Sequence, residues 1–445
     1  MLIFVPKLTN RMGYTINVVF HHLLQIDYNI TTDADFYRAS TDIRLCYGDH
    51  RLDDSPYIRS CGLLFTSSIE EQNPRPFTYE NITALFPTYD REALLPFDLF
   101  AATFYLVSRY EEYLPHHIDA YGRYPASESV AGQHGFLLTP VVDYWALMLH
   151  QALKRVYPEL PGSHRRYRFE ATVDIDAAYC YRHKGMLRTL AGIFRDLTSS
   201  TNRDTFKTRL RVLSGLQPDP FDTFDYLLEQ STHYPDIQML FFALMGDYGQ
   251  YDKPISHSCN TFRELLQHLG DHAKMGIHAS FQSAEEPERV GMETRRLADI
   301  LHRPIVRNRY HYLRLQLPQS YRRLIHEEIR HDYSMGYAET SGYRAGTLTP
   351  YPFYDLERDE EGTLIIHPFS VMDTTLIKHQ QLSPEEALEH YRRLIDQARS
   401  LNGTFCGIWH NQNVCNNADW LDWRRVFEQV LAYGHSDIPE TKKQL

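Results

Sequence analysis

Two patterns of hydrophobic and polar residues divide the chain near residue 160. After that point, short apolar runs alternate with amphipathic helical stretches, which is typical of a parallel α/β fold. One run, residues 237–244 (IQMLFFAL), is almost entirely apolar, as expected of a strand buried on both faces. The Pro- and Gly-containing break at residues 158–163 marks the boundary. We therefore predict a smaller α+β domain over residues 1–162 and an α/β domain over residues 163–445.

The second domain begins with residues 168–179 (RFEATVDIDAAY). Apolar and polar residues alternate over 169–173, which predicts a half-buried strand. Asp174 and Asp176 stand two residues apart at its end, so a strand would direct both carboxylates to the same face. Two like charges so close are costly unless a cation or a proton lies between them.

Two helices are indicated clearly by their ends and by an apolar stripe. One covers residues 96–114, where Pro96 suits the first helical position. We expect Arg109, Glu111 and Glu112, near its end, to lie on a solvated face or at a domain contact. The other follows Ser383, which is a good N-cap residue because its hydroxyl can accept a hydrogen bond from a backbone N–H of the first turn.

Composition and charge narrow the class of protein. The 445 residues are 43% hydrophobic and 23% charged, which is ordinary for a folded chain with a sizeable core. The net charge of −11 argues against nucleic acid and against an anionic membrane surface as partners. The six cysteines are scattered without a C-x-x-C pair, which fits a reduced compartment and excludes a thiolate zinc site.

The sequence also predicts a cytoplasmic protein without a membrane span. The apolar run after Met1 has only four residues and is followed by Pro6 and Lys7, which is too short for an export signal. No stretch approaches the ~18 apolar residues that a spanning helix needs. No pattern in the sequence sets an oligomeric state.

Polar residues that could act in catalysis or metal binding recur where predicted strands end. In parallel α/β proteins, functional side chains gather at these strand ends. Besides the Asp pair, the candidates are His278, Arg309, His311, Asp332 with Arg344 in the loop that follows it, and His410. One such histidine is most often structural, but Asp, His and Arg at successive strand ends favour a functional site over packing.

In these residues the chain resembles the polysaccharide deacetylases of the NodB-homology class, carbohydrate esterase family 4 and its relatives. It is most similar to a bacterial subgroup with an extra N-terminal module, and residues 97–144 also resemble that subgroup. The resemblance covers the whole chain, with its mechanistic motifs in residues 168–415. It implies an irregular (β/α)7 NodB-like barrel and metal-dependent removal of acetyl groups from sugars.

The resemblance also implies roles for individual residues. In the family's D-x-D motif one Asp is the general base and the other binds the metal, so Asp174 would be the base and Asp176 a ligand. The second motif, His-[Ser/Thr]-x-x-His, is matched only by His278, because Gln282 stands four residues on. His311, one strand along, or a water molecule would then complete the site.

Two further roles follow from the same motifs. An arginine orients the catalytic Asp, and Arg309 fits by its order in the chain, with Arg344 as a rival. A histidine that ends a strand acts as the general acid, and His410 stands in that place. Mixed oxygen and nitrogen ligands suit Zn²⁺ best, and Co²⁺, Ni²⁺ or Mn²⁺ as well.

The sequence therefore predicts a metal-dependent deacetylase that acts on a carbohydrate, either an N-acetylated sugar or a polysaccharide or glycan precursor. The alternative, from a different class, is a non-catalytic carbohydrate-binding protein that keeps a degenerate barrel. Gln282, in place of the second motif histidine, is the feature that supports this alternative.

Overall fold

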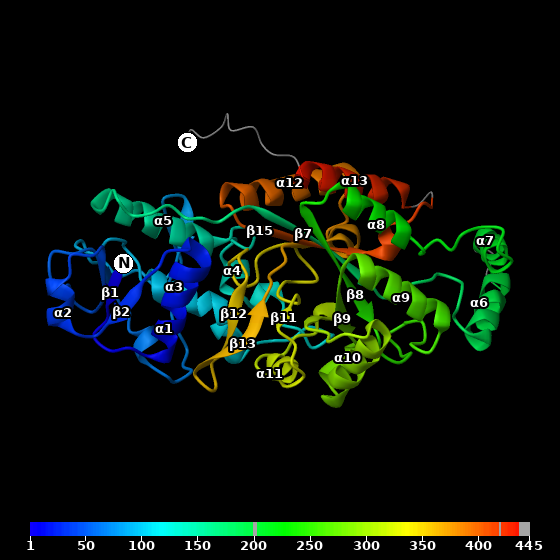
Figure 1. Cartoon of the computed structure of the whole chain (residues 1–445), viewed down its shortest axis with the longest axis horizontal. Coiled ribbons are helices and arrows are strands. Elements are labelled where there is room, and N and C mark those ends of the chain that lie inside the picture. Colours follow the sequence, from blue (N-terminus) through cyan, green and yellow to red (C-terminus); the bar gives the residue numbers. More distant parts are fainter. Residues whose placement is uncertain (199–202, 418–419, 436–445) are drawn as a thin grey trace. The chain divides into compact units, whose positions relative to one another are not determined.

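The computed structural model describes residues 1–198, 203–417 and 420–435, and the chain forms two compact units. The first unit comprises Met1–Tyr167, Leu315–Ser370 and Asp396–Phe405. The second comprises Arg168–Arg314, Val371–Ile395 and Cys406–Leu445. Figure 1 follows the chain through both. The first unit thus draws on three segments of the sequence, and the domain boundary at residues 162–163 stays a prediction.

A parallel sheet lies at the centre of the second unit, with strands in the order β10-β9-β8-β7-β15-β14. The strands are β7 (Arg168–Ile175), β8 (Ile237–Leu244), β9 (Lys274–Ala279), β10 (Arg307–Tyr310), β14 (Val371–Met372) and β15 (Thr404–His410). The pairs β7–β8, β8–β9, β9–β10 and β14–β15 are all parallel. An α/β fold with a large parallel sheet is therefore confirmed, whereas closure into a (β/α)7 barrel stays a prediction.

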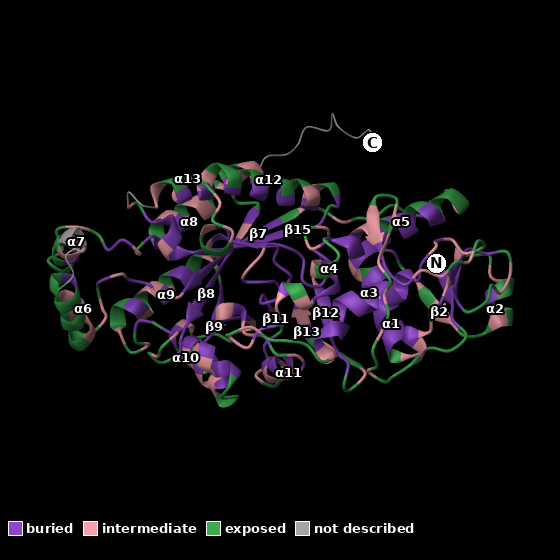
Figure 2. Cartoon of the chain, turned by 180° about the vertical axis from the view of Figure 1, so that it is seen from behind, coloured by how far each residue is buried: buried purple, intermediate pink, exposed green. Residues whose placement is uncertain are grey.

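The burial of these strands explains their composition. In β8 every residue except Gln238 is buried, which confirms the expectation from its apolar run, and Figure 2 shows this strand in the colour of buried residues. Asp174 of β7 pairs in register with Phe242 of β8, and His278 of β9 with Arg309 of β10. Because the strands run in the same direction, their carboxyl ends lie at one edge of the sheet.

Helices connect the strands of this unit. They are α6 (Met186–Thr198), α7 (Arg203–Leu213), α8 (Phe224–His233), α9 (Asn260–His272), α10 (Glu288–Leu301), α12 (Pro384–Ser400) and α13 (Leu421–His435). The start of α12 is as predicted, because the Ser383 N–H donates to Glu386 and the Glu386 N–H donates to the Ser383 hydroxyl. Among the described residues, no helix is both long enough and apolar enough to cross a membrane.

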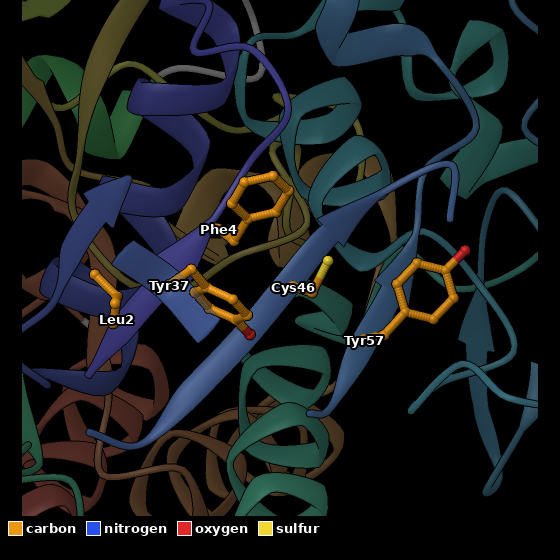
Figure 3. Close-up of a cluster of buried hydrophobic side chains, with 5 residues drawn as sticks. All are labelled: Leu2, Phe4, Tyr37, Cys46 and Tyr57. Atoms are coloured by element: carbon orange, nitrogen blue, oxygen red, sulfur yellow. The ribbon is translucent and has the colours of Figure 1, made fainter. Parts of the chain in front are cut away.

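The first unit contains a smaller sheet with its own core. Its strand order is β2-β1-β3-β4, all parallel, formed by β1 (Leu2–Phe4), β2 (Asn29–Thr31), β3 (Arg44–Gly48) and β4 (Tyr57–Arg59). Figure 3 shows a buried cluster on these strands and on α2 (Ala34–Ala39), made of Leu2, Phe4, Tyr37, Cys46 and Tyr57. The buried residues of this cluster all come from the first 57 residues, and Ala34, Leu52 and Ala93 pack against them.

The remaining elements of the first unit come from the middle of the chain as well. They are α1 (Asn10–Asn17), which continues as a π-helix over Val18–Leu24, α3 (Leu99–Val107), α4 (Val130–Gln133), α5 (Val141–Val156), α11 (Gln319–His326), β5 (Phe77–Tyr79), β6 (Ile82–Ala84), β11 (His331–Asp332), β12 (Tyr351–Asp355) and β13 (Glu360–Ile366). Strand β13 pairs in parallel with β11 and antiparallel with β12.

The helix predicted over residues 96–114 is shorter than expected. It ends as α3 at Val107, because Arg109 adopts a left-handed backbone conformation with φ 55°. Its charged residues are not solvated, which corrects that expectation: Arg109, Glu111 and Glu112 are buried. Arg109 Nε lies 2.7 Å from Glu112, and Arg344 donates to both Glu112 oxygens at 2.8 and 2.7 Å. We call these four residues the arginine–glutamate cluster.

Candidate metal centre

Three side chains from the ends of strands β7, β9 and β10 meet at the carboxyl edge of the second unit's sheet. Asp176 follows β7, His278 lies in β9 and His311 follows β10. One ligand atom from each lies within 4.8 Å of the others. Asp176 Oδ1 is 3.3 Å from His278 Nε2 and 3.6 Å from His311 Nε2. The strand-end pattern thus placed three chemically suitable groups together, and their role as metal ligands stays a prediction.

A hydrogen bond at Nδ1 fixes the orientation of each imidazole. His278 Nδ1 lies 2.9 Å from the backbone oxygen of Arg309, and His311 Nδ1 lies 2.7 Å from Asp252 Oδ1. Because these oxygens only accept, Nδ1 carries a proton in both rings. Nε2 is then the nitrogen that can take a metal, and such hydrogen bonds are the usual outer support of metal-ligating histidines.

The space between the three groups fits a cation. Asp176 Oδ1 is buried and lacks a hydrogen-bond partner in the described part of the chain. Burial alone would raise the pKa of Asp176, but the positive charge of His311, together with His278 and His410, holds that pKa well below its usual value. Burial lowers the pKa of His311, but Asp176 and Asp252 outweigh this and raise it to about 10. One oxygen and two imidazole nitrogens suit Zn²⁺ and leave positions open for other ligands.

Asp174 lies beside this group and is held by an arginine. Its Oδ1 accepts a hydrogen bond of 2.6 Å from Arg309, and the same guanidinium donates to the Thr172 hydroxyl at 2.8 Å. Phe242 covers the guanidinium at 4.4 Å. Asp174 Oδ2 is 3.7 Å from His278 Nε2. One oxygen of Asp174 is therefore fixed by Arg309, while the other faces the three grouped side chains.

The two candidate arginines have different environments. Arg309 is buried beside Asp174 in the second unit. Arg344 lies in the first unit, where it is held by Glu112 and also donates to the Gly336 carbonyl at 3.2 Å. A catalytic role for Arg344 stays a prediction, and Arg309 is the candidate arginine that contacts Asp174.

His410 approaches the group from the end of β15. Its Nδ1 is 2.7 Å from Asp373 Oδ1, and its Nε2 is 3.7 Å from Asp176 Oδ2. The other Asp373 oxygen accepts hydrogen bonds of 2.8 Å from the His410 N–H and from Asn413. Burial lowers the pKa of His410, but Asp373 and then Asp176 and Asp174 raise it to about 9.

Sequence reasoning missed Asp252, which follows β8 in residues 246–256 (GDYGQYDKPIS). Besides His311, it accepts a hydrogen bond of 2.9 Å from the Phe281 N–H. The rule that polar residues gather after buried strands applied to this loop as well. Asp373 supports His410, whereas His367 lies in the first unit, 3.0 Å from His331.

The serines next to Gln282 have partners of their own. The Ser280 hydroxyl donates to Glu293 at 2.5 Å, and the Ser283 hydroxyl donates to the Ser280 carbonyl at 2.6 Å. His311 is the third side chain grouped with Asp176 and His278, and its equivalence to the second histidine of the motif stays a prediction.

Comparisons with known proteins give a family match for the N-terminal part alone. Residues 1–158, about a third of the chain, match a family of unknown function, DUF7033. No curated protein matches the sequence.

Solved structures resemble part of the chain. A protein from Mycobacterium smegmatis assigned as a polysaccharide deacetylase is 13% identical, with a TM-score of 0.40, over 60% of this chain and 85% of its own. PuuE allantoinase is 11% identical, with a TM-score of 0.38, over 61% and 91%. A protein from Pseudomonas aeruginosa PAO1 assigned as a polysaccharide deacetylase is 10% identical, with a TM-score of 0.37, over 61% and 91%. At these TM-scores the activity must be inferred from the residues themselves.

Proposed function

We propose that this chain is a metal-dependent deacetylase that removes an acetyl group from an N-acetylated sugar or glycan precursor. The observation that carries the proposal is the meeting of three functional groups at one sheet edge. These are the Asp176–His278–His311 group, the carboxylate of Asp174 held by Arg309, and the imidazole of His410 held by Asp373. The choice of a sugar substrate rests on the motif resemblance.

Amide hydrolysis needs each of these groups. A divalent cation bound by Asp176, His278 and His311 would polarise the amide carbonyl and lower the pKa of a bound water. Asp174 takes the proton of the attacking water, and Arg309 keeps one Asp174 oxygen in place so that the other points to that water. Asp373 holds the Nδ1 proton of His410, so Nε2 is the atom that gives a proton to the departing amine.

The test combines metal analysis with acetate release from N-acetylglucosamine oligomers. The wild-type protein should hold stoichiometric metal and release acetate. Asp176→Asn, His278→Ala and His311→Ala should each lose the metal and the activity while remaining folded. His272→Ala, at an exposed position of α9, is the matched control and should change neither quantity.

Two results would count against the proposal in different ways. Unchanged metal content in all three variants would exclude this group as the metal site. Metal-loaded protein that binds the oligomers without releasing acetate would favour the non-catalytic carbohydrate-binding alternative.

A further inference from the structure

The second unit exposes an apolar face of helix α6 that none of the described residues of the unit covers. The exposed large side chains of α6 recur at helical spacing and lie on one side of it: Met186, Leu187, Leu190, Phe194 and Leu197. Met186 and Leu187 are 82% and 85% exposed, and Phe194 is 70% exposed. Figure 2 shows most of α6 in the colour of exposed residues. A helix of a folded unit ordinarily turns such a face inward.

The helix is held in this orientation by polar contacts on its other side. Asp196 is buried in α6 and lies 2.7 Å from Arg209 Nε of α7. Gly192 faces the same guanidinium, since a Cβ at residue 192 would lie 2.7 Å from it. Arg209 also covers the ring of Tyr181 at 4.7 Å. The contact between the two helices of this hairpin is therefore polar, and the apolar face of α6 points away from it. Leu210 and Leu213 of α7 and Leu216 after it are also exposed.

The charge of this hairpin is opposite to that of the chain. Residues 182–216 contain eight Lys or Arg and two Asp, a net charge of +6, whereas the whole chain carries −11. Arg195 has a side chain that is 75% exposed, and Lys207 and Arg211 are exposed on α7. The two helices are thus both basic and rich in exposed apolar side chains.

We propose that the α6–α7 hairpin docks this protein on the surface of an anionic lipid bilayer. Exposed leucines and a phenylalanine flanked by cations are the features by which interfacial helices insert their apolar side below acidic headgroups. A symmetric contact in which the same two helices of two copies meet is disfavoured, because it would bring two surfaces of net charge +6 together. The contact is peripheral, in keeping with the described helices, none of which can span a membrane.

Cosedimentation of the full chain with lipid vesicles tests this proposal. Binding is expected to vesicles that contain phosphatidylglycerol, to be weak with phosphatidylcholine alone, and to fall as salt is raised. Leu187→Gln combined with Phe194→Gln should weaken partitioning at least about tenfold by removing apolar anchors. Lys207→Glu combined with Arg211→Glu should abolish the preference for the anionic lipid.

A matched control uses exposed apolar residues elsewhere in the chain. Phe36 and Ile118 are 59% and 61% exposed, so Phe36→Gln combined with Ile118→Gln removes similar apolar surface and should leave vesicle binding unchanged. Circular dichroism and thermal melting confirm that each variant is folded. Absence of binding to anionic vesicles would overturn the proposal, as would equal losses in the hairpin and control variants. Light scattering that shows a dimer, made monomeric by the hairpin variant, would assign the face to a second copy instead.

Discussion

Each unit buries a group of charged side chains. The two groups differ in whether their buried polar atoms have hydrogen-bond partners within the described chain. In the arginine–glutamate cluster of the first unit, two cations face two anions. Each guanidinium nitrogen of Arg344 has an acceptor, either on Glu112 or on the Gly336 carbonyl. In the second unit, Asp176 Oδ1 is buried without a hydrogen-bond partner among the described residues, between two imidazole nitrogens.

This difference distinguishes buried charged groups with a structural role from those with a functional role. A buried ion pair that is complete within the chain stabilises the arrangement of segments that are far apart in the sequence, and it has no need of a ligand. Ligand atoms that converge without a partner are a cost to the fold, which a bound cation removes. The contrast predicts that substitutions in the two groups have opposite consequences for stability and for activity.

The largest expected effect is a loss of turnover when Asp174, beside the Asp176–His278–His311 group, is replaced. Asp174→Asn should keep the metal and lower kcat by about 10²–10⁴-fold, because the amide cannot accept the proton of water. Acetate release and metal content are measured on the same preparation. An Asp174→Asn protein without metal, alongside a metal-loaded Asp176→Asn protein, would show that the two roles are swapped.

The next largest effect is a loss of folding stability when Arg344 of the arginine–glutamate cluster is replaced. Arg344→Met leaves part of the buried Glu112 charge uncompensated and should lower the free energy of unfolding by about 3–5 kcal/mol. Urea denaturation measures this loss, and metal content should be unchanged in the folded protein. Arg358→Met, at a side chain that is 60% exposed, is the control and should have little effect. Loss of metal without loss of stability in Arg344→Met would instead connect Arg344 to the site.

The smallest effect is a pH dependence of that same stability. Burial alone would raise the pKa of Glu112, but Arg344 and Arg109 outweigh it and lower the pKa to about 2, below the ordinary 4.5. The ionised Glu112 therefore stabilises the fold above pH 4.5, and this contribution is lost as the pH falls toward 2. The difference in unfolding free energy between wild type and Glu112→Gln should shrink by about half between pH 7 and pH 3. A difference that stays constant over that range would contradict the assignment.

Local patterns in the sequence were enough to find the residues at strand ends. An apolar strand followed by a polar residue is a short-range signal, and it led to Asp176, His278 and His311. Asp252 stands 59 residues before its partner His311, in a loop without periodicity, so no local signal joined the two. The choice between Arg309 and Arg344 depended in the same way on three-dimensional contacts.

Two features of the chain could not be read from local patterns or from the net charge of the whole chain. The charges near the end of α3 were expected on a solvated face or at a domain contact. Their burial was not foreseen because Arg344, which pairs with Glu112, lies 232 residues away. The net charge of −11 argued against an acidic membrane, although residues 182–216 alone carry +6. A charge count over each predicted helical segment would have shown the second feature.

The supports behind the two imidazoles differ in how they can be lost by mutation. His311 is oriented by the side chain of Asp252, so its orientation depends on the residues at both positions. His278 is oriented by the backbone oxygen of Arg309, and every substitution at position 309 leaves that carbonyl in the chain. Genetic drift can therefore change the arginine that holds Asp174 without removing the acceptor for His278. The acceptor for His278 therefore persists through any substitution at position 309, whereas the acceptor for His311 is lost when Asp252 is replaced by a residue that cannot accept.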